Sequence, residues 1–189
     1  MSRVARAVFP GVPYHICQRG NNKRIVFPSD EDRMFYLSSF KARSKKYKLK
    51  TLAYCLMNNH VHFIVIPTEK FSLSDTFREV NMIYVQYFNK KYKRVGHLWN
   101  GRYYSVMLDE NHLAIGARYV ERNPVRADLT SRPEEWEWSS AAKHISGKDC
   151  YLDLDDMFKY TSLKTNKWKD FVNQEERSSE LCFARQGFK

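Results

Sequence analysis

The sequence has no hydrophobic run long enough to cross a membrane. A transmembrane helix needs about 20 consecutive apolar residues, and no stretch of this 189-residue chain approaches that length. Residues 1–6 also lack the apolar segment of a secretory signal peptide. We therefore expect a cytosolic protein with no membrane partner.

Cysteine, glycine and proline are scarce as well, with four, seven and six copies. The cysteines at 17, 55, 150 and 182 are far apart and form no C-x-x-C pair, which argues against a disulfide framework and against a zinc knuckle. Residues of type AVILMFWYC make up 43% of the chain and aromatics 15%, a composition typical of a packed globule rather than a disordered chain. At this length we expect one core domain with an appendage.

Acidic residues are fewer than basic residues in this chain. The 32 Lys and Arg residues against 21 Asp and Glu give a formal net charge of +11. Such an excess of positive charge predicts a polyanionic partner.

Hydrophobic periodicity predicts six elements before residue 109. Strand patterns cover 14–19, 49–57, 60–66 and 102–108, and helical patterns run from Ser29 to about 47 and from Ser72 or Ser74 to about 93. The order β-α-β-β-α-β is the ferredoxin-like arrangement, an α+β fold with a four-stranded antiparallel sheet. We expect its two helices to cover one face of the sheet and the other face to be open.

A further helix is predicted after Asp109, which has the character of an N-cap, through Arg122. Asn123 and Pro124 should stop this helix, and residues 125–127 should form a loop. A short helix over 140–145 and one or two amphipathic helices in the tail would follow. We therefore divide the chain into a core, residues 1–128, and a helical C-terminal extension, residues 129–189.

Two histidines stand out in the strand over 60–66. Side chains alternate between the faces of a strand, so His60 and His62 point the same way, opposite to Val61, Phe63 and Val65. Two imidazoles on one face can share a divalent ion, although alternating histidines on a strand are more often incidental.

The helix after Asp109 carries a second set of polar positions. His112, Gly116, Tyr119 and Asn123 follow one another at intervals of one turn, so Tyr119 and Asn123 should project together. Gly116 would leave room beside Tyr119 for something to approach, or be a turn-forming glycine with no such role. A core position for Tyr119 and a helix stop for Asn123 are the structural alternatives.

Several segments together resemble a known family. The segments are 10–15 (PGVPYH), 19–22 (RGNN), 56–62 (LMNNHVH), 96–99 (GHLW), 119–127 (YVERNPVRA) and 136–140 (WEWSS). Residues 3–145 on this basis are similar to the REP-associated tyrosine transposases, which are HUH endonucleases with a single catalytic tyrosine.

The resemblance implies a metal-dependent, single-stranded DNA endonuclease and strand transferase. Its substrates would be hairpins formed by REP-type palindromes, in the cytoplasm of a bacterium, and its covalent intermediate a 5′-phosphotyrosine on Tyr119. By the family pattern, His60, His62 and Asn123 would bind the metal. This donor set suits Mg²⁺ or Mn²⁺. The base that activates Tyr119 stays open, with His112 a candidate by geometry only.

Basic and aromatic residues near the first strand and in the segment before the fourth are the expected DNA contacts. They are Arg3, Arg6, Arg19, Arg24, Arg94, Trp99 and Arg102. Two alternatives remain open at this point: a non-catalytic protein that binds DNA or RNA hairpins, and a hydrolase that uses activated water. The sequence also leaves open a monomer or a homodimer.

Overall fold

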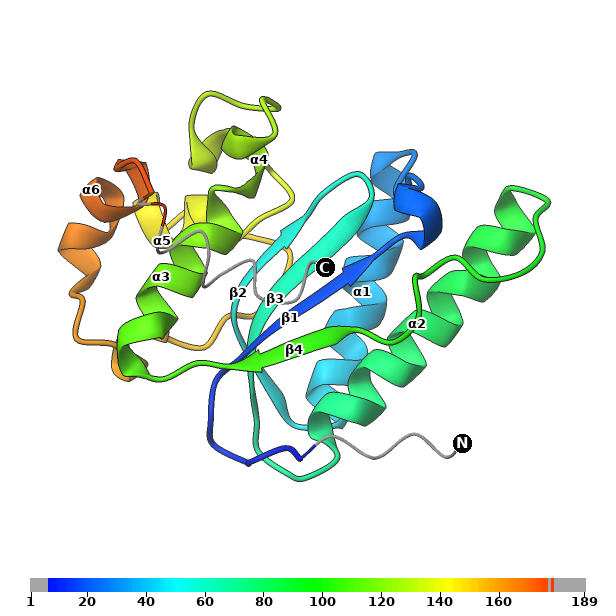
Figure 1. Cartoon of the computed structure of the whole chain (residues 1–189), viewed down its shortest axis with the longest axis horizontal. Helices are drawn as coiled ribbons and strands as arrows, with labels where there is room; N and C mark the ends of the chain where they lie inside the picture. The colour runs from blue at the N-terminus through cyan, green and yellow to red at the C-terminus, as the bar shows by residue number, and fades with distance from the viewer. Residues whose placement is uncertain (1–6, 177, 179–189) are drawn as a thin grey trace.

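Residues 7–176 and 178 are described in the computed structural model (Figure 1). Helices and strands alternate through the first half of the chain, and short helices follow. The elements are β1 (Tyr14–Arg19), α1 (Asp30–Lys46), β2 (Leu49–Leu56), β3 (His60–Pro67), α2 (Ser72–Lys91), β4 (Tyr104–Met107), α3 (Glu110–Glu121), α4 (Asn123–Arg126), α5 (Ala141–Ser146) and α6 (Trp168–Asn173).

The four strands form one antiparallel sheet in the order β2-β3-β1-β4. This order and the β-α-β-β-α-β sequence of elements confirm the predicted ferredoxin-like α+β fold. The register of β1 against β3 places Cys17 opposite His62 and Arg19 opposite His60. β1 thus runs beside the strand with the two histidines.

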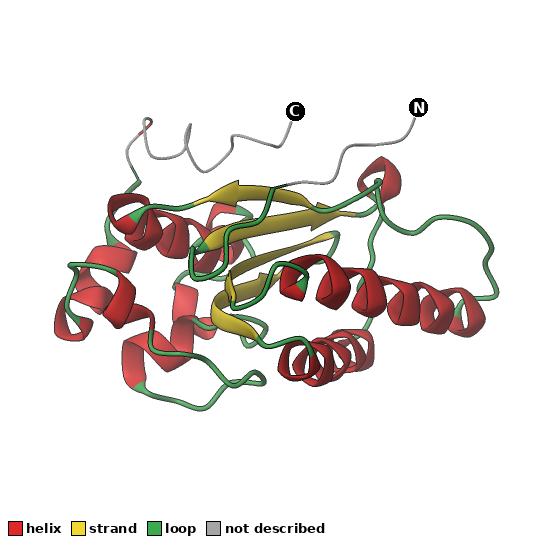
Figure 2. Ribbon diagram, turned by 90° about the horizontal axis from the view of Figure 1, so that it is seen from below, coloured by secondary structure: helices red, strands yellow, loops and turns green. Residues whose placement is uncertain are grey.

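Helices α1 and α2 cover one face of the sheet (Figures 1 and 2). Val61, Phe63 and Val65 point into this layer and are fully buried, as their alternation with the histidines predicts. Phe40 of α1 stacks on Phe63 with 4.2 Å between ring centroids. Burial of aromatic rings of this size contributes most of the hydrophobic stabilisation on this face.

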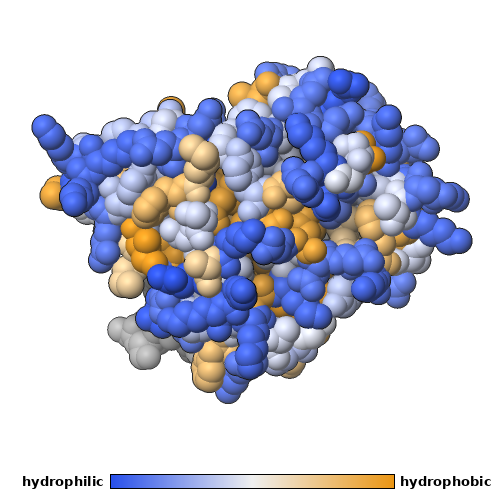
Figure 3. Space-filling view, turned by 180° about the vertical axis from the view of Figure 1, so that it is seen from behind, coloured by the Kyte–Doolittle hydropathy of each residue, from blue (hydrophilic) through white to orange (hydrophobic). Residues whose placement is uncertain are grey.

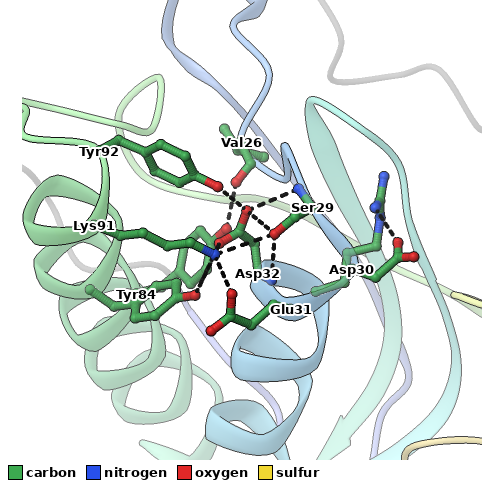
Figure 4. A network of polar contacts seen from close by, with 10 residues as sticks. Val26, Ser29, Asp30, Glu31, Asp32, Tyr84, Lys91 and Tyr92 are labelled. Atoms are coloured by element: carbon green, nitrogen blue, oxygen red, sulfur yellow. Dashed lines mark hydrogen bonds and ion pairs between the residues drawn. The ribbon is translucent and has the colours of Figure 1, made fainter.

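A polar network clamps the start of α1 to the end of α2 (Figure 4). Ser29 caps α1 as predicted and forms a capping box with Asp32. The carboxylate of Asp32, fully buried, accepts hydrogen bonds from Lys91 Nζ (2.8 Å) and from the Tyr92 hydroxyl (2.6 Å). These partners offset the desolvation of the buried charge and hold its pKa below the usual range.

The second face of the sheet is not open, contrary to our prediction. Helix α3 lies across β2 and β3 and buries its own apolar positions, with Leu113 and Val120 fully inaccessible. Gly116 permits this approach: a Cβ there would stand 3.2 Å from Leu108 Cδ1 and 3.6 Å from Ile64 Cδ1. The space beside Gly116 is therefore filled by packing rather than left for a ligand.

The chain after α4 packs against the outer strand β2. The backbone amide of Leu56 donates to Trp138 O (2.9 Å), and that of Ser140 donates to Tyr54 O (3.0 Å). These bonds satisfy backbone groups that an outer strand would otherwise expose. Residues 136–140 thus extend the sheet's hydrogen bonding at β2.

Glu121, at the end of α3, fastens this C-terminal segment to the core. Its buried carboxylate accepts from Ser140 Oγ (2.6 Å) and from Trp168 Nε1 (3.0 Å), and it pairs with His144 Nδ1 (2.6 Å). Trp168 is fully buried in the cluster between α3 and the sheet. Trp168 of α6 therefore packs onto the core.

Two local predictions are corrected. β4 spans only four residues, because the chain before it turns at Gly101, whose φ of +70° is in the left-handed region. Residues 125–127 are not an open loop, because Pro124 starts the short helix α4, where a missing N–H costs nothing.

Seen from behind, the molecule is largely hydrophilic, with apolar residues showing between the charged ones (Figure 3). No helix in residues 7–176 and 178 is long and apolar enough to span a bilayer.

Cys17 and Cys55 are buried free thiols, as expected, and Cys150 is a half-buried one; Cys182 lies outside the described residues.

Candidate functional site

A pocket opens where α3 ends over the second face of the sheet. It has a volume of about 240 Å³ and collects residues from four elements. Its wall includes Arg19 of β1, His60 of β3, Tyr119 of α3, and Asn123 and Arg126 of α4. The structure therefore brings together side chains that are up to about a hundred positions apart in the sequence.

His60 and His62 share this side of β3, as the strand alternation predicts. Their ring centroids are 4.9 Å apart; His62 is fully buried and His60 is half-buried at the pocket. Burial, then the guanidinium of Arg19, lowers the pKa of His60 to about 3. Burial, then the neighbouring imidazoles of His60 and His15, lowers the pKa of His62 well below its usual value. Both rings are thus neutral at pH 7, the form that can bind a metal ion.

A third histidine, which we did not single out from the sequence, lies behind this pair. His15 Nε2 is 2.9 Å from His62 Nδ1, and the two rings are stacked with centroids 5.2 Å apart. His15 is 4% exposed, and burial followed by Arg126 lowers its pKa to about 4. Strand alternation alone places His15 on the same face of β1 as Arg19. The contact between His15 and His62 depends on the register between β1 and β3.

Tyr119 lies beside the rings of His62 and His15. Its ring meets that of His62 edge-on with centroids 5.7 Å apart, and that of His15 at 6.0 Å. Asn123 Nδ2 donates to Tyr119 O (3.0 Å), and its side chain hydrogen-bonds to His60. The spacing of four residues therefore places both side chains at the pocket, as predicted.

Arg126 is a second residue that the sequence reasoning missed. Its guanidinium carbon stands 4.0 Å from the centroid of the Tyr119 ring, and Nη2 donates to Tyr119 O (2.6 Å). Nη1 also pairs with Glu176 (2.6 Å). We had placed Arg126 in a loop after Pro124. If residues 123–126 are instead taken as helical, Arg126 comes about one turn after Asn123, and this spacing predicts that both side chains face the same site.

The donor set fits a divalent cation of the Mg²⁺ or Mn²⁺ type. In residues 7–176 and 178, no group of three or more His, Cys, Asp and Glu side chains could hold a metal ion. The sequence-based expectation for a third protein ligand is an amide oxygen. Asn123 is the candidate, because it lines the pocket beside His60 while its Nδ2 is directed to the backbone of α3. Two imidazoles and an amide oxygen are ligands that Mn²⁺ accepts, and Mg²⁺ less readily.

The expected DNA contacts divide into several groups. Arg19 lies in the pocket itself, whereas Arg24 and Arg94 are half-buried in the segments that follow β1 and α2. Arg3 and Arg6 lie outside the described residues.

Arg102 and Trp99 line a larger groove, of about 890 Å³, between α2 and the chain leading to β4. Arg102 is exposed there, beside Lys70 and Arg78. Our prediction that Trp99 contacts DNA bases is wrong. Trp99 is 7% exposed, and its indole packs in the core, with its ring centroid 6.0 Å from that of Tyr36.

His112, the candidate base named from the sequence, lies in the first turn of α3. Asp109 caps this helix by accepting from the His112 backbone N–H (2.8 Å), and Nδ1 of His112 is 2.7 Å from the same Asp109 oxygen. In the turn after β1, the backbone amides of Gly20 and Asn21 donate to Asn59 O and Leu98 O, both at 2.8 Å.

Comparison with solved structures places the fold among transposases. The chain is similar to a structure described as a REP associates tyrosine transposase bound to a REP hairpin, with 16% identity, a TM-score of 0.63, and coverage of 83% of this chain and 93% of that chain. A putative transposase from Deinococcus radiodurans is 18% identical over 65% of this chain and 97% of its own, with a TM-score of 0.44. The first likeness supports the fold, and the second is too distant to carry an argument.

Comparison of the sequence with known families and proteins identifies the family. No curated protein matches the chain. The family described as "Transposase IS200 like" matches residues 9–123, a stretch that includes both histidines of β3, Tyr119 and Asn123. Since this match covers more than half of the chain, the protein belongs to the IS200-like transposase family.

Proposed function

We propose that the protein cuts and rejoins single-stranded DNA at hairpins formed by REP-type palindromes, with Tyr119 as the nucleophile. One observation carries the proposal: Tyr119, His60 and Asn123 line the same pocket, and His62 lies against the Tyr119 ring. A structural role alone would not require a tyrosine, two neutral imidazoles and an amide to converge at one opening.

In the proposed step, the Tyr119 oxygen attacks the scissile phosphorus in line with the departing 3′-oxygen. A bond forms between phosphorus and the tyrosine oxygen, and the bond from phosphorus to the 3′-oxygen breaks. The phenol loses its proton and the leaving oxygen gains one, which gives a free 3′-hydroxyl. The 5′-phosphotyrosine retains a phosphodiester bond, so attack by another 3′-hydroxyl can rejoin strands without an energy source.

His60, His62 and Asn123 are the residues that would hold Mg²⁺ or Mn²⁺. When bound, such an ion neutralises charge on the scissile phosphate. Arg19 lines the same pocket and adds a permanent positive charge for a phosphate oxygen. Arg126 holds the Tyr119 ring and carbonyl from the other side, which fixes the nucleophile's position.

The groove between α2 and the chain before β4 supports DNA as the substrate. Lys70, Arg78 and Arg102 lie along it, and the chain as a whole carries a net charge of +11. The solved relative with the REP hairpin has the same fold, although its hairpin belongs to that protein. We therefore assign the basic groove to the duplex stem or its flanks.

The experiment is an adduct assay on hairpin oligonucleotides with Mn²⁺. Wild-type protein should give an SDS-resistant protein–DNA band and a free 3′-hydroxyl product, whereas Tyr119→Phe should give neither and still shift the hairpin on a native gel. Tyr151→Phe is the matched control, because that hydroxyl is bonded to Glu137 at the surface.

Two outcomes would contradict the proposal and identify the alternative. If wild type shifts several hairpins but forms no adduct and no product, the protein is a hairpin-binding module. If Tyr119→Phe still cleaves, the reaction uses activated water and not the tyrosine.

A further inference from the structure

The family match ends at residue 123, whereas side-chain contacts at the Tyr119 pocket continue into the C-terminal extension. Arg126 lines the pocket, and its Nη1 is 2.7 Å and 2.6 Å from the two carboxylate oxygens of Glu176. Nη2 of the same guanidinium donates to Tyr119 O (2.6 Å). A residue of the extension is therefore linked to the proposed nucleophile through a single side chain.

Three arginines spaced four residues apart, from α3 to α4, contact the chain at and after α6. Nη1 of Arg118 donates to Phe171 O (3.4 Å), and Nη1 of Arg122 donates to Val172 O (2.9 Å). Both carbonyls are in the last turn of α6, where intrahelical donors are missing. Arg126 is the third arginine and contacts the chain beyond α6. These donors fix the end of α6 and the residues after it against α3.

The carboxylate of Glu176 is enclosed between two guanidinium groups. Its side chain is 6% exposed, and its Oε2 is 2.6 Å from Arg126 Nη1 and 3.4 Å from Arg122 Nε. Ion pairs of this kind offset the desolvation of a buried carboxylate. Because Arg122 holds Glu176 from one side, Glu176 can hold Arg126 from the other.

At the pocket, the guanidinium of Arg126 lies over the ring of Tyr119, with 4.0 Å between Cζ and the ring centroid. Its Nη1 is held by Glu176 and its Nη2 by Tyr119 O, so the planar group is fixed at two nitrogens. The same tyrosine ring meets the ring of His62 edge-on. Without the Glu176 contact, the guanidinium would be free to turn away from the ring.

We propose that the C-terminal extension takes part in the reaction: Glu176 is a positioning residue that holds the Arg126 guanidinium on Tyr119 and so keeps the nucleophile in line with the scissile phosphate. The inference rests on the proposed tyrosine chemistry and assigns part of it to a segment that the family match does not cover. The position of a nucleophile matters greatly, because a displacement of about 1 Å can slow a reaction about 100-fold.

The first experiment measures single-turnover adduct formation and hairpin affinity separately. Glu176→Gln keeps the size of the side chain and removes its charge; it should slow adduct formation by about 10-fold and leave hairpin affinity within about twofold of wild type. Glu175→Gln is the matched control, because it makes the same change at an exposed neighbour, and it should behave as wild type. Thermal melting of each variant shows that it is folded.

A double-mutant cycle tests whether Glu176 acts through Arg126. Arg126→Ala should slow adduct formation by about 100-fold, and it should stay folded because Glu176 keeps Arg122 as a partner. Arg126→Lys should be nearly as slow, since an ammonium group lacks the planar fork that makes both contacts. Adding Glu176→Gln to Arg126→Ala should cause no further loss, because two residues that act through one contact are not additive.

A spectroscopic measurement on the protein without DNA separates positioning from general damage. Tyrosine rings labelled with ¹³C report their surroundings, and Tyr119→Phe identifies the resonances of Tyr119. Glu176→Gln should shift these resonances in the same direction as Arg126→Ala does, and by less. Glu175→Gln should leave them where they are in wild type.

Failure of the inference is distinguishable from failure of the proposed function. If wild type forms the adduct but folded Glu176→Gln forms it as fast or faster, the positioning inference alone is overturned. The same holds if the losses multiply in the double variant, or if Glu176→Gln leaves the Tyr119 resonances unchanged. Glu176→Asp, which keeps the charge but shortens the side chain, replaces Glu176→Gln with the same expectations if that variant does not fold. If wild type forms no adduct with any hairpin, the proposed function fails and the inference fails with it.

Discussion

The two faces of the sheet use the same strand for different purposes. On the α1/α2 face, β3 contributes Val61, Phe63 and Val65, which are completely buried among aromatic rings. On the α3 face it contributes Ile64 to a second apolar cluster, but His60 to a polar pocket, with His62 buried against the Tyr119 ring. Alternation along a single strand therefore separates a structural surface from a chemical one.

The covering helices explain why the pocket with His60 and Tyr119 opens on the α3 face. α1 and α2 are long, at 17 and 20 residues, and are clamped together through Asp32 and Lys91. α3 has 12 residues and ends over the sheet, so the chain turns at Asn123 and leaves an opening. The pocket lies where the α3 layer stops, because there a ligand can reach side chains of β1 and β3.

The largest effect is expected from a substitution on the α3 face, which tests whether this face serves the chemistry and the α1/α2 face serves stability. His60→Ala should reduce DNA cleavage by about a thousandfold, because it removes a ligand of an ion that contributes several kcal/mol to catalysis. The melting temperature should hardly change, since the side chain is only half-buried at the pocket. Single-turnover cleavage and thermal melting measure the two effects; a large loss of stability together with activity would contradict the division.

The reciprocal test is a substitution of a core residue on the α1/α2 face. Phe63→Ala should lower the free energy of unfolding by about 3–5 kcal/mol, the cost of removing a buried aromatic ring and leaving a cavity. At a temperature where the variant is folded, hairpin cleavage should stay within a fewfold of wild type. Urea denaturation gives the stability, with Phe71→Ala, an exposed phenylalanine, as control.

Acid should weaken the α3 face specifically. The pKa of His15 is lowered to about 4, mainly by burial, while an unfolded histidine titrates near 6.5. Between these values the unfolded state binds more protons, so stability is complete above pH 6.5 and falls as the pH drops towards 4. At pH 5 the loss from His15 is about 2 kcal/mol, and His62 adds in the same direction.

Urea unfolding at pH 7 and pH 5, without divalent ions, measures this loss. His15→Phe should show a smaller difference between the two pH values than wild type. Equal pH dependence in both proteins would show that the buried imidazoles do not account for the acid sensitivity.

The smallest expected effect is at the groove beside α2. Arg102→Ala should lower hairpin affinity modestly and reduce the slope of log affinity against log salt by about 1, because one phosphate contact is lost. Arg132→Ala removes the same charge from a residue paired with Glu135, 2.8 Å away, and should leave the slope unchanged. Titrations by fluorescence anisotropy at several salt concentrations give both values, and equal slopes for the two variants would remove the groove from the DNA-binding surface.

Local rules were enough for much of the fold. Ser29 and Asp109 cap their helices as predicted, and the six elements of the ferredoxin-like core follow from periodicity. The spacing of Tyr119 and Asn123 also brought both to one pocket, because residues four apart share a helix face. These features depend on a few neighbouring residues only.

The missed features all depend on contacts between distant segments. The role of Arg126 depends on the helix that begins at Pro124, and Trp99 is buried because Phe27, Tyr36 and Tyr84 surround it. The second sheet face is closed because α3 can approach at Gly116. No periodicity within one segment reports such contacts.

The sequence by itself determined that His60 and His62 share one side of a strand and that Tyr119 and Asn123 share one side of a helix, since strand and helix periods are properties of the backbone. Only the tertiary structure decided that these two sides meet at one pocket, that Arg126 lines it, that His15 contacts His62 behind it, and that α3 covers the rest of the face. The reason is that strand register and helix packing are set by contacts between residues far apart in the chain, which no local pattern contains.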